Sequence, residues 1–107
     1  MKALVITSTG VTTVEDITPD LDTLQSLVGG YIEAAPTDGS VTVYVNEEGK
    51  VTGLPVNPEA TRLYYKLAPF MEGHDILVGT VVILGPVDDE GEETEVPASV
   101  LALAEVE

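Results

Sequence analysis

The segment "DILVGTVVILG", residues 75–85, constrains the fold more than any other part of the sequence. Its central run, residues 81–84, consists only of valine, isoleucine and leucine and offers no polar face to water. Such a strand is typical of one covered on both faces, whereas a half-solvated strand alternates polar and apolar residues. We therefore expect residues 81–84 to form a strand covered on both faces, by the chain's own helices or by a second copy of the chain.

Four further short segments have the composition of strands, at residues 2–7, 11–17, 31–35 and 41–45. The last of these alternates valine with threonine or tyrosine, which is the period expected of a strand. The strands are short and joined by turns, and helical patterns interrupt them. The sequence therefore predicts an α+β fold with a mostly antiparallel sheet packed by two or three helices. A length of 107 residues fits one small domain.

Three segments carry helix signals. Thr18 is placed to cap a helix that has Pro19 at its first position and ends at residues 29–30, two glycines. Asn57 and Pro58 repeat this pattern for a second helix, which Pro69 should end. Residues 97–107 can form a terminal helix, following an acidic loop at 87–96.

The passage "GKVTGLPVNPEATRLYY", residues 49–65, raises the question of a ligand cradle. A phosphate at a helix N-terminus needs free N–H groups and positive potential. Here Pro58 lacks an N–H, Asn57 uses another as a cap, and Glu59 adds negative charge. A capped helix is therefore favoured. Gly49 is expected to take a positive φ in a turn at residues 46–50.

The same passage supplies the candidate interface. Adjacent residues on a helix cannot both face inward, so one of the two tyrosines should pack beside Leu63 and the other should lie at the surface. An exposed tyrosine is a suitable anchor for a protein partner. The candidate interface residues are Gly53, Leu54, Pro55, Tyr64 and Tyr65.

The charge balance excludes several classes of partner. Four Lys and Arg face nineteen Asp and Glu, for a net charge of −15. Phosphate contacts need Lys and Arg, so direct binding to nucleic acid or to an anionic membrane is excluded, while a basic protein partner is permitted. No apolar run reaches the ~20 residues of a membrane span. The absence of Cys and of a signal-peptide pattern predicts a cytoplasmic protein.

A dense acidic run follows the apolar strand and should form a solvated loop. Its spacing does not match an EF-hand, so only weak, nonspecific cation binding is expected. The carboxylates of this loop are Asp88, Asp89, Glu90, Glu92, Glu93 and Glu95.

No motif for catalysis or for a cofactor is present. The sequence lacks a nucleophile elbow, a Walker loop and a dinucleotide-binding glycine motif. His74 is the single histidine, and its neighbours Glu72 and Asp75 suggest a carboxylate-rich metal or ligand site as an alternative. A surface-loop histidine is favoured, because a general base or metal ligand needs partners that this sequence does not supply. We expect a protein that is not an enzyme and has no cofactor.

Three blocks carry a family resemblance: "LQSLVGGYIE" (24–33), "NEEGKVTGLPVNPEAT" (46–61) and "DILVGTVVILG" (75–85). In this order they resemble the family catalogued as domain of unknown function 3846, over about residues 1–86. The resemblance implies a phage or mobile-element origin, often in actinobacteria, and expression in the bacterial cytoplasm. It implies no activity and no catalytic residues.

Besides an enzyme or small-ligand binder that uses His74 with the nearby acids, three functional hypotheses follow from these observations. The first is a small acidic module, not an enzyme, that binds a host protein, which could be basic. The alternative is a DNA mimic that inhibits a host DNA-binding or defence protein, because the net charge of −15 resembles the dense negative charge of DNA. Self-association as a homodimer is a third reading, because the apolar strand could lie under a partner subunit.

Overall fold

The computed structural model describes residues 1–106. They form one five-stranded sheet of order β2-β1-β5-β4-β3, in which all neighbouring strands are antiparallel. The strands are β1 (Lys2–Ile6), β2 (Thr12–Asp16), β3 (Ile32–Ala35), β4 (Thr42–Asn46) and β5 (Val81–Leu84). The predicted α+β fold with a mostly antiparallel sheet is confirmed.

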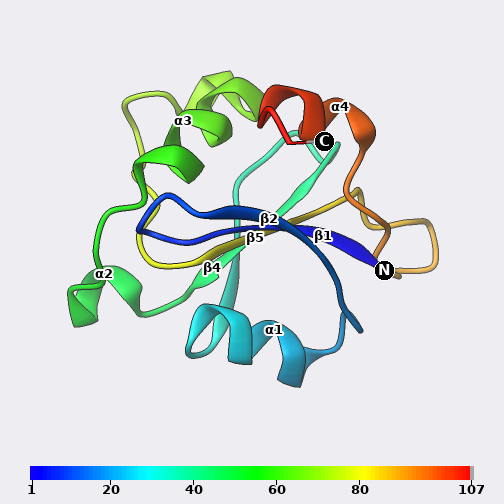
Figure 1. Cartoon of the computed structure of the whole chain (residues 1–107), viewed down its shortest axis with the longest axis horizontal. Coiled ribbons are helices and arrows are strands. Elements are labelled where there is room, and N and C mark those ends of the chain that lie inside the picture. Colours follow the sequence, from blue (N-terminus) through cyan, green and yellow to red (C-terminus); the bar gives the residue numbers. More distant parts are fainter. Residues whose placement is uncertain (107) are drawn as a thin grey trace.

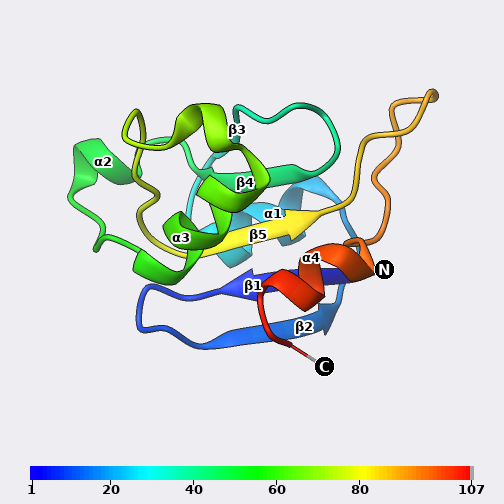
Figure 2. The same ribbon diagram turned by 90° about the horizontal axis from the view of Figure 1, so that it is seen from above.

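Helices cover both faces of this sheet (Figure 1). The α-helices are α1 (Leu21–Val28), α2 (Gly49–Thr52), α3 (Pro58–Leu67) and α4 (Ala98–Leu103), and a 3-10 helix, η1 (Pro69–Met71), follows α3. Helix α1 lies on one face, and α3 and α4 lie on the other, where Figure 2 shows them above β5 and β1. Among residues 1–106, no helix is long and apolar enough to cross a membrane.

Strand β5 is the centre of the core. Val81 and Ile83 belong to the apolar cluster under α3 and α4, while Val82 and Leu84 belong to the cluster under α1. All four side chains have no exposed surface. The predicted coverage on both faces is confirmed, and the alternative in which a second copy covers this strand is wrong, because the chain's own helices bury it.

The structure corrects two local predictions about helix and turn residues. Asp20, not Thr18, caps α1: its carboxylate accepts the N–H of Thr23 at 2.8 Å. Gly49 has no positive φ and instead begins α2, which Gly53 ends at a φ of 76°. A Cβ at Gly49 would lie 2.8 Å from Val78 Cγ2, so glycine is needed here for close packing and not for a turn.

The terminal helix is shorter than residues 97–107. Helix α4 begins at Ala98 and ends at Leu103, and residue 107 lies outside the described residues. Val100 anchors this helix, since it is buried in the cluster shared with α3. The second predicted helix is confirmed: Asn57 caps α3, Pro58 is its first residue, and the helix ends two residues before Pro69.

Asn57 joins three parts of the structure through its buried side chain. Its Nδ2 donates hydrogen bonds to the carbonyl oxygens of Ile6, at 2.9 Å, and Gly79, at 2.8 Å. Its Oδ1 accepts the N–H of Ala60 at 3.0 Å, inside the first turn of α3. The cap therefore ties the end of β1 and the approach to β5 to the start of α3, and the side chain is completely buried with both of its amide hydrogens donated inside the protein.

Replacing Asn57 with alanine should lower the free energy of unfolding by about 2–4 kcal/mol, because two buried carbonyls and one N–H lose their partner. Urea unfolding followed by circular dichroism would measure this. Asn46→Ala is the control: its amide donates to Val28 O from a partly exposed position, and its loss should cost about 1 kcal/mol. Equal losses in the two variants would contradict the role given to Asn57.

Candidate functional site

The Gly53–Leu54–Pro55 part of the candidate interface is mainly a packing element. Leu54 covers two glycines: a Cβ at Gly79 would lie 2.8 Å from Leu54 Cδ1, and one at Gly49 would lie 3.2 Å from it. The Pro55 carbonyl accepts the N–H of Gly79 at 2.8 Å. Gly53 and Pro55 are exposed, but Leu54 is partly buried. This loop therefore holds the segment before β5 in place.

The two tyrosines do not form a surface anchor together. Tyr64 is completely buried, and its hydroxyl donates to Pro36 O at 2.6 Å. Tyr65 is partly buried, and its hydroxyl donates to Asp75 O at 2.5 Å. The prediction that one tyrosine faces inward is confirmed. The assignment of Tyr64 to an interface is wrong, because α3 turns this side chain into the core beside Leu63.

His74 is exposed in the loop after η1, so the prediction of a surface-loop histidine is confirmed. The carboxylate of its neighbour Asp75 forms an ion pair with Lys50 and also accepts the N–H of Ile76. Asp75 is therefore engaged elsewhere and does not complete a site with His74. In the part of the chain that the structure describes, no group of three or more Asp, Glu or His side chains is placed to hold a metal ion.

The acidic loop between β5 and α4 is attached to the sheet at its base and projects at its tip (Figure 2). Glu93 Oε1 accepts the hydroxyl of Tyr44 at 2.6 Å, and Glu95 Oε2 accepts the N–H of Lys2 at 2.7 Å. At the tip, Asp88 Oδ1 accepts the N–H groups of Glu90 and Glu92, each at 2.9 Å. The expectation of a uniformly solvated loop is therefore wrong for Glu93.

The Tyr44–Glu93 contact is partly buried. Burial raises the pKa of the Tyr44 hydroxyl above its usual value, and the hydrogen bond to the Glu93 carboxylate raises it further. The second carboxylate oxygen of Glu93 is buried and has no hydrogen-bond partner among residues 1–106. The contact fixes the base of the loop and positions no group for catalysis.

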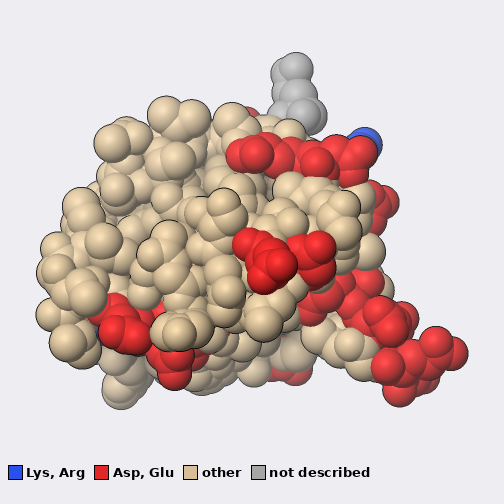
Figure 3. Space-filling model, turned by 90° about the horizontal axis from the view of Figure 1, so that it is seen from below, with Lys and Arg blue, Asp and Glu red and all other residues tan. Residues whose placement is uncertain are grey.

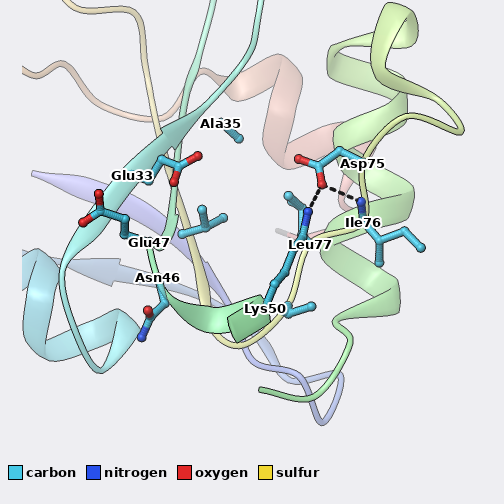
Figure 4. A pocket seen from close by; sticks show the side chains of 10 residues that line it. Glu33, Ala35, Asn46, Glu47, Lys50, Asp75, Ile76 and Leu77 are labelled. Carbon is cyan, nitrogen blue, oxygen red and sulfur yellow. Dashed lines mark hydrogen bonds and ion pairs between the residues drawn. The ribbon is translucent and has the colours of Figure 1, made fainter. Parts of the chain in front are cut away.

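A small cleft lies on the α3 side of the sheet, between β3 and the segment that precedes β5. Its volume is about 80 Å³. Figure 4 shows the carboxylates of Glu33 and Asp75 on opposite sides of the cleft, with Lys50 paired to Asp75. Glu47 also lines the cleft, so its charged groups are three carboxylates and one ammonium.

This cleft is small compared with the roughly 300–1,000 Å³ of a typical small-molecule pocket. It has room for the end of one cationic side chain and not for a nucleotide. A wider hollow of about 490 Å³, between the end of α1 and α2, is shallow and open to solvent. Neither has the paired donors and acceptors of an enzyme active site.

No local pattern in the sequence reveals the cleft, because its walls come from segments about forty residues apart. Glu33 stands on β3, while Asp75 lies beyond α3. One signal was available: Lys50 is one of only four Lys and Arg in a chain with nineteen acids. Such a cation is a candidate for an ion pair, but the sequence does not say with which carboxylate.

The environment of Tyr44 predicts a loss of stability at alkaline pH. The pKa values of Tyr44 and Tyr64 are raised in the folded protein, so the unfolded chain ionises first, near pH 10, and stability falls as the pH rises above that value. Tyr44→Phe should make this fall shallower. At pH 7 it should also lower the unfolding free energy by about 1–2 kcal/mol, because Glu93 loses its donor.

Urea midpoints at pH 7, 9, 10 and 11 would measure both effects. Tyr31→Phe serves as the control, since the side chain of Tyr31 is 64% exposed. An unchanged alkaline slope in Tyr44→Phe would show that Tyr44 does not contribute to it.

Comparison with known proteins identifies the family of this chain. Neither the curated proteins nor the solved structures gave a significant match. One family model matches residues 1–105, so it includes the acidic loop and α4 as well as the expected residues 1–86. The chain therefore belongs to the family described as "Domain of unknown function (DUF3846)".

Proposed function

We propose that this protein is an acidic binding module, not an enzyme, that engages a basic host protein in a bacterial cell carrying a phage or plasmid. The observation that carries this proposal is the unbalanced surface charge. Figure 3 shows separated groups of Asp and Glu across one face of the molecule, with little Lys or Arg among them. Two of the four Lys and Arg, Lys50 and Arg62, pair with the chain's own Asp75 and Glu59.

Such a surface attracts positively charged partners over a distance of about one Debye length, roughly 8–10 Å in physiological salt. It raises the rate of association with basic proteins and repels nucleic acid. The family resemblance supports the setting, a mobile element expressed in the bacterial cytoplasm. The partner in this reading is a protein of the host.

The engagement of the potentially reactive groups supports a role other than catalysis. The hydroxyls of Tyr44, Tyr64 and Tyr65 each donate to a group of the protein itself. His74 is exposed and lines an open hollow of about 380 Å³ with Lys50 and Asp75, whose charged groups pair with each other and not with His74. A binding role requires only the charged surface and does not require a free reactive side chain.

DNA mimicry is the second candidate, and the exposed carboxylates at the tip of the acidic loop favour it. Duplex DNA carries a charge about every 1.7 Å along its axis, so a mimic needs an ordered array of carboxylates. Glu93 and Glu95 bond to the sheet instead and interrupt such an array. Binding to a basic surface by ordinary charge complementarity is therefore preferred.

Affinity capture from a bacterial lysate, with mass spectrometry of the bound proteins, tests the proposal. We expect a basic protein to be retained at about 50 mM salt and released by about 500 mM, because screening weakens exposed charge pairs. A variant with Asp88→Asn, Asp89→Asn, Glu90→Gln and Glu92→Gln should retain less of it. The control Ser40→Ala leaves the charge unchanged.

Competing duplex DNA separates the two candidates. Displacement of the partner by DNA would favour mimicry, whereas a partner that DNA does not displace supports binding outside a DNA site. Capture of proteins with no basic character, unchanged by salt, would contradict the proposal itself.

A further inference from the structure

Strand β3 is an open edge of the sheet, and only part of its backbone is bonded. In an antiparallel pair, successive residues point their N–H and C=O groups alternately toward the partner strand and away from it. Glu47 N–H donates to Tyr31 O at 2.8 Å, so Tyr31, Glu33 and Ala35 bond toward β4. The N–H and C=O groups of Ile32 and Ala34 therefore point outward.

The open stretch has clear limits at both ends. Before it, the N–H of Gly30 donates to Gln25 O at 3.1 Å. After it, Pro36 has no N–H, and its carbonyl accepts the hydroxyl of Tyr64 at 2.6 Å. Two residues thus present two donors and two acceptors, and no hydrogen bond within residues 1–106 reaches these groups.

Hollows adjoin this edge at two places. The cleft of about 80 Å³ lies beside Glu33, where three carboxylates surround one ammonium. A more open hollow of about 310 Å³ adjoins Ala34, and its walls include Val41 and Val87. The lining of this second hollow contains no charged residue. The edge is therefore acidic at one position and mainly apolar at the next.

We propose that β3 accepts an extended segment of the partner as a sixth strand, with a Lys or Arg opposite Glu33 and a small apolar residue opposite Ala34. The inference rests on the proposed function and names how the basic partner is held. Residues directly opposite one another in neighbouring strands share a face, so the basic side chain lies over the cleft and approaches Glu33 and Asp75. The backbone ladder supplies affinity, and the alternating hollows supply specificity.

A second copy of this chain is a poor occupant of the same edge. Pairing β3 with β3 would bring acidic edges together, with Glu33 of each copy close to the other, and like charges opposite one another destabilise a pair of strands. Each copy also carries a net charge of −15. The charge of the edge thus selects a basic segment over self-association.

The probe is the synthetic peptide acetyl-Val-Arg-Val-Arg-Val-Thr-amide, titrated to millimolar concentration into ¹⁵N-labelled protein. We expect chemical-shift changes centred on Ile32 to Ala34. The amide hydrogens of Ile32 and Ala34, which point outward, should exchange more slowly with solvent when the peptide is bound. Two N-methylated forms of the peptide, one on odd and one on even residues, test the ladder directly.

One N-methylated form removes the donors that face β3, and the other removes donors that face away. Only the first should lose binding, whereas binding by charge alone would leave the two forms equal and would overturn the proposal. This comparison uses the unmodified protein and does not depend on how any variant folds.

Two pairs of variants add an independent test. Ala34→Pro removes an outward donor, which an edge strand tolerates, and should weaken peptide binding at least about tenfold. Thr12→Pro removes the equivalent outward N–H on β2 and should leave binding unchanged. Glu33→Lys should weaken binding more than Asp89→Lys, which changes the net charge equally at the distant tip of the loop.

The results also separate this inference from the proposed function. Peptide binding without slower exchange of the Ile32 and Ala34 amide hydrogens would overturn the docking site. It would not contradict the proposal that the partner is basic. Absence of any binding to the peptide would overturn the docking site, while the lysate capture decides the proposed function on its own. Growth of a dimer in light scattering, weakened by Ala34→Pro, would show that a second copy occupies the edge and would overturn the proposal.

Discussion

The buried side chain of Asn57 is the contact on which the rest of the arrangement depends. A single amide satisfies the carbonyls of Ile6 and Gly79 and caps α3. Without it, these groups would stay buried and unpaired, which is costly in a low-dielectric interior. This one residue fixes where α3 begins over the sheet. It thereby helps to place Tyr64, on the same helix, in the core.

The fold leaves backbone hydrogen-bonding groups of β3 unpaired at one edge of the sheet. Both faces are covered by helices, and the side chains of β5 have no exposed surface. Many proteins protect an edge strand by keeping it short or by placing charge and proline there. Here β3 has four residues, contains Glu33 and is followed by Pro36. These features discourage pairing with another copy and are compatible with the proposed docking of a segment of opposite charge.

The local patterns of the sequence predicted most of the fold. The apolar run at residues 81–84 predicted a strand covered on both faces, and the Asn57–Pro58 pair predicted the start of α3, because both features depend on neighbouring residues alone. Predictions that depend on distant contacts were less successful. The local pattern predicts a turn at Gly49. Its role in close packing is hidden because its neighbour Val78 is remote in sequence. Both Asp and Thr suit an N-cap position, so the sequence alone does not decide between Thr18 and Asp20, and the structure shows Asp20 as the cap.

The candidate site could be predicted only in part for the same reason. Gly53 and Pro55 are at the surface as proposed, but the orientation of Tyr64 depends on how α3 lies over the sheet. The attachment of the acidic loop near its C-terminal end depends on Tyr44 and Lys2, which no local pattern connects to Glu93 and Glu95. The cleft beside Glu33 needs β3 and the segment at Asp75 to be adjacent, which only the tertiary structure shows.

The position of β5 also determines when this protein can fold during its synthesis. This strand is the last of the five in the chain, yet it lies between β1 and β4 in the sheet. Its register pairs Leu4 with Ile83, so two residues far apart in the sequence must meet before the sheet is continuous. Contacts of such long range slow folding, because much chain entropy is lost before they form. During synthesis, the β1–β2 and β3–β4 hairpins therefore cannot join into one sheet until β5 has emerged from the ribosome.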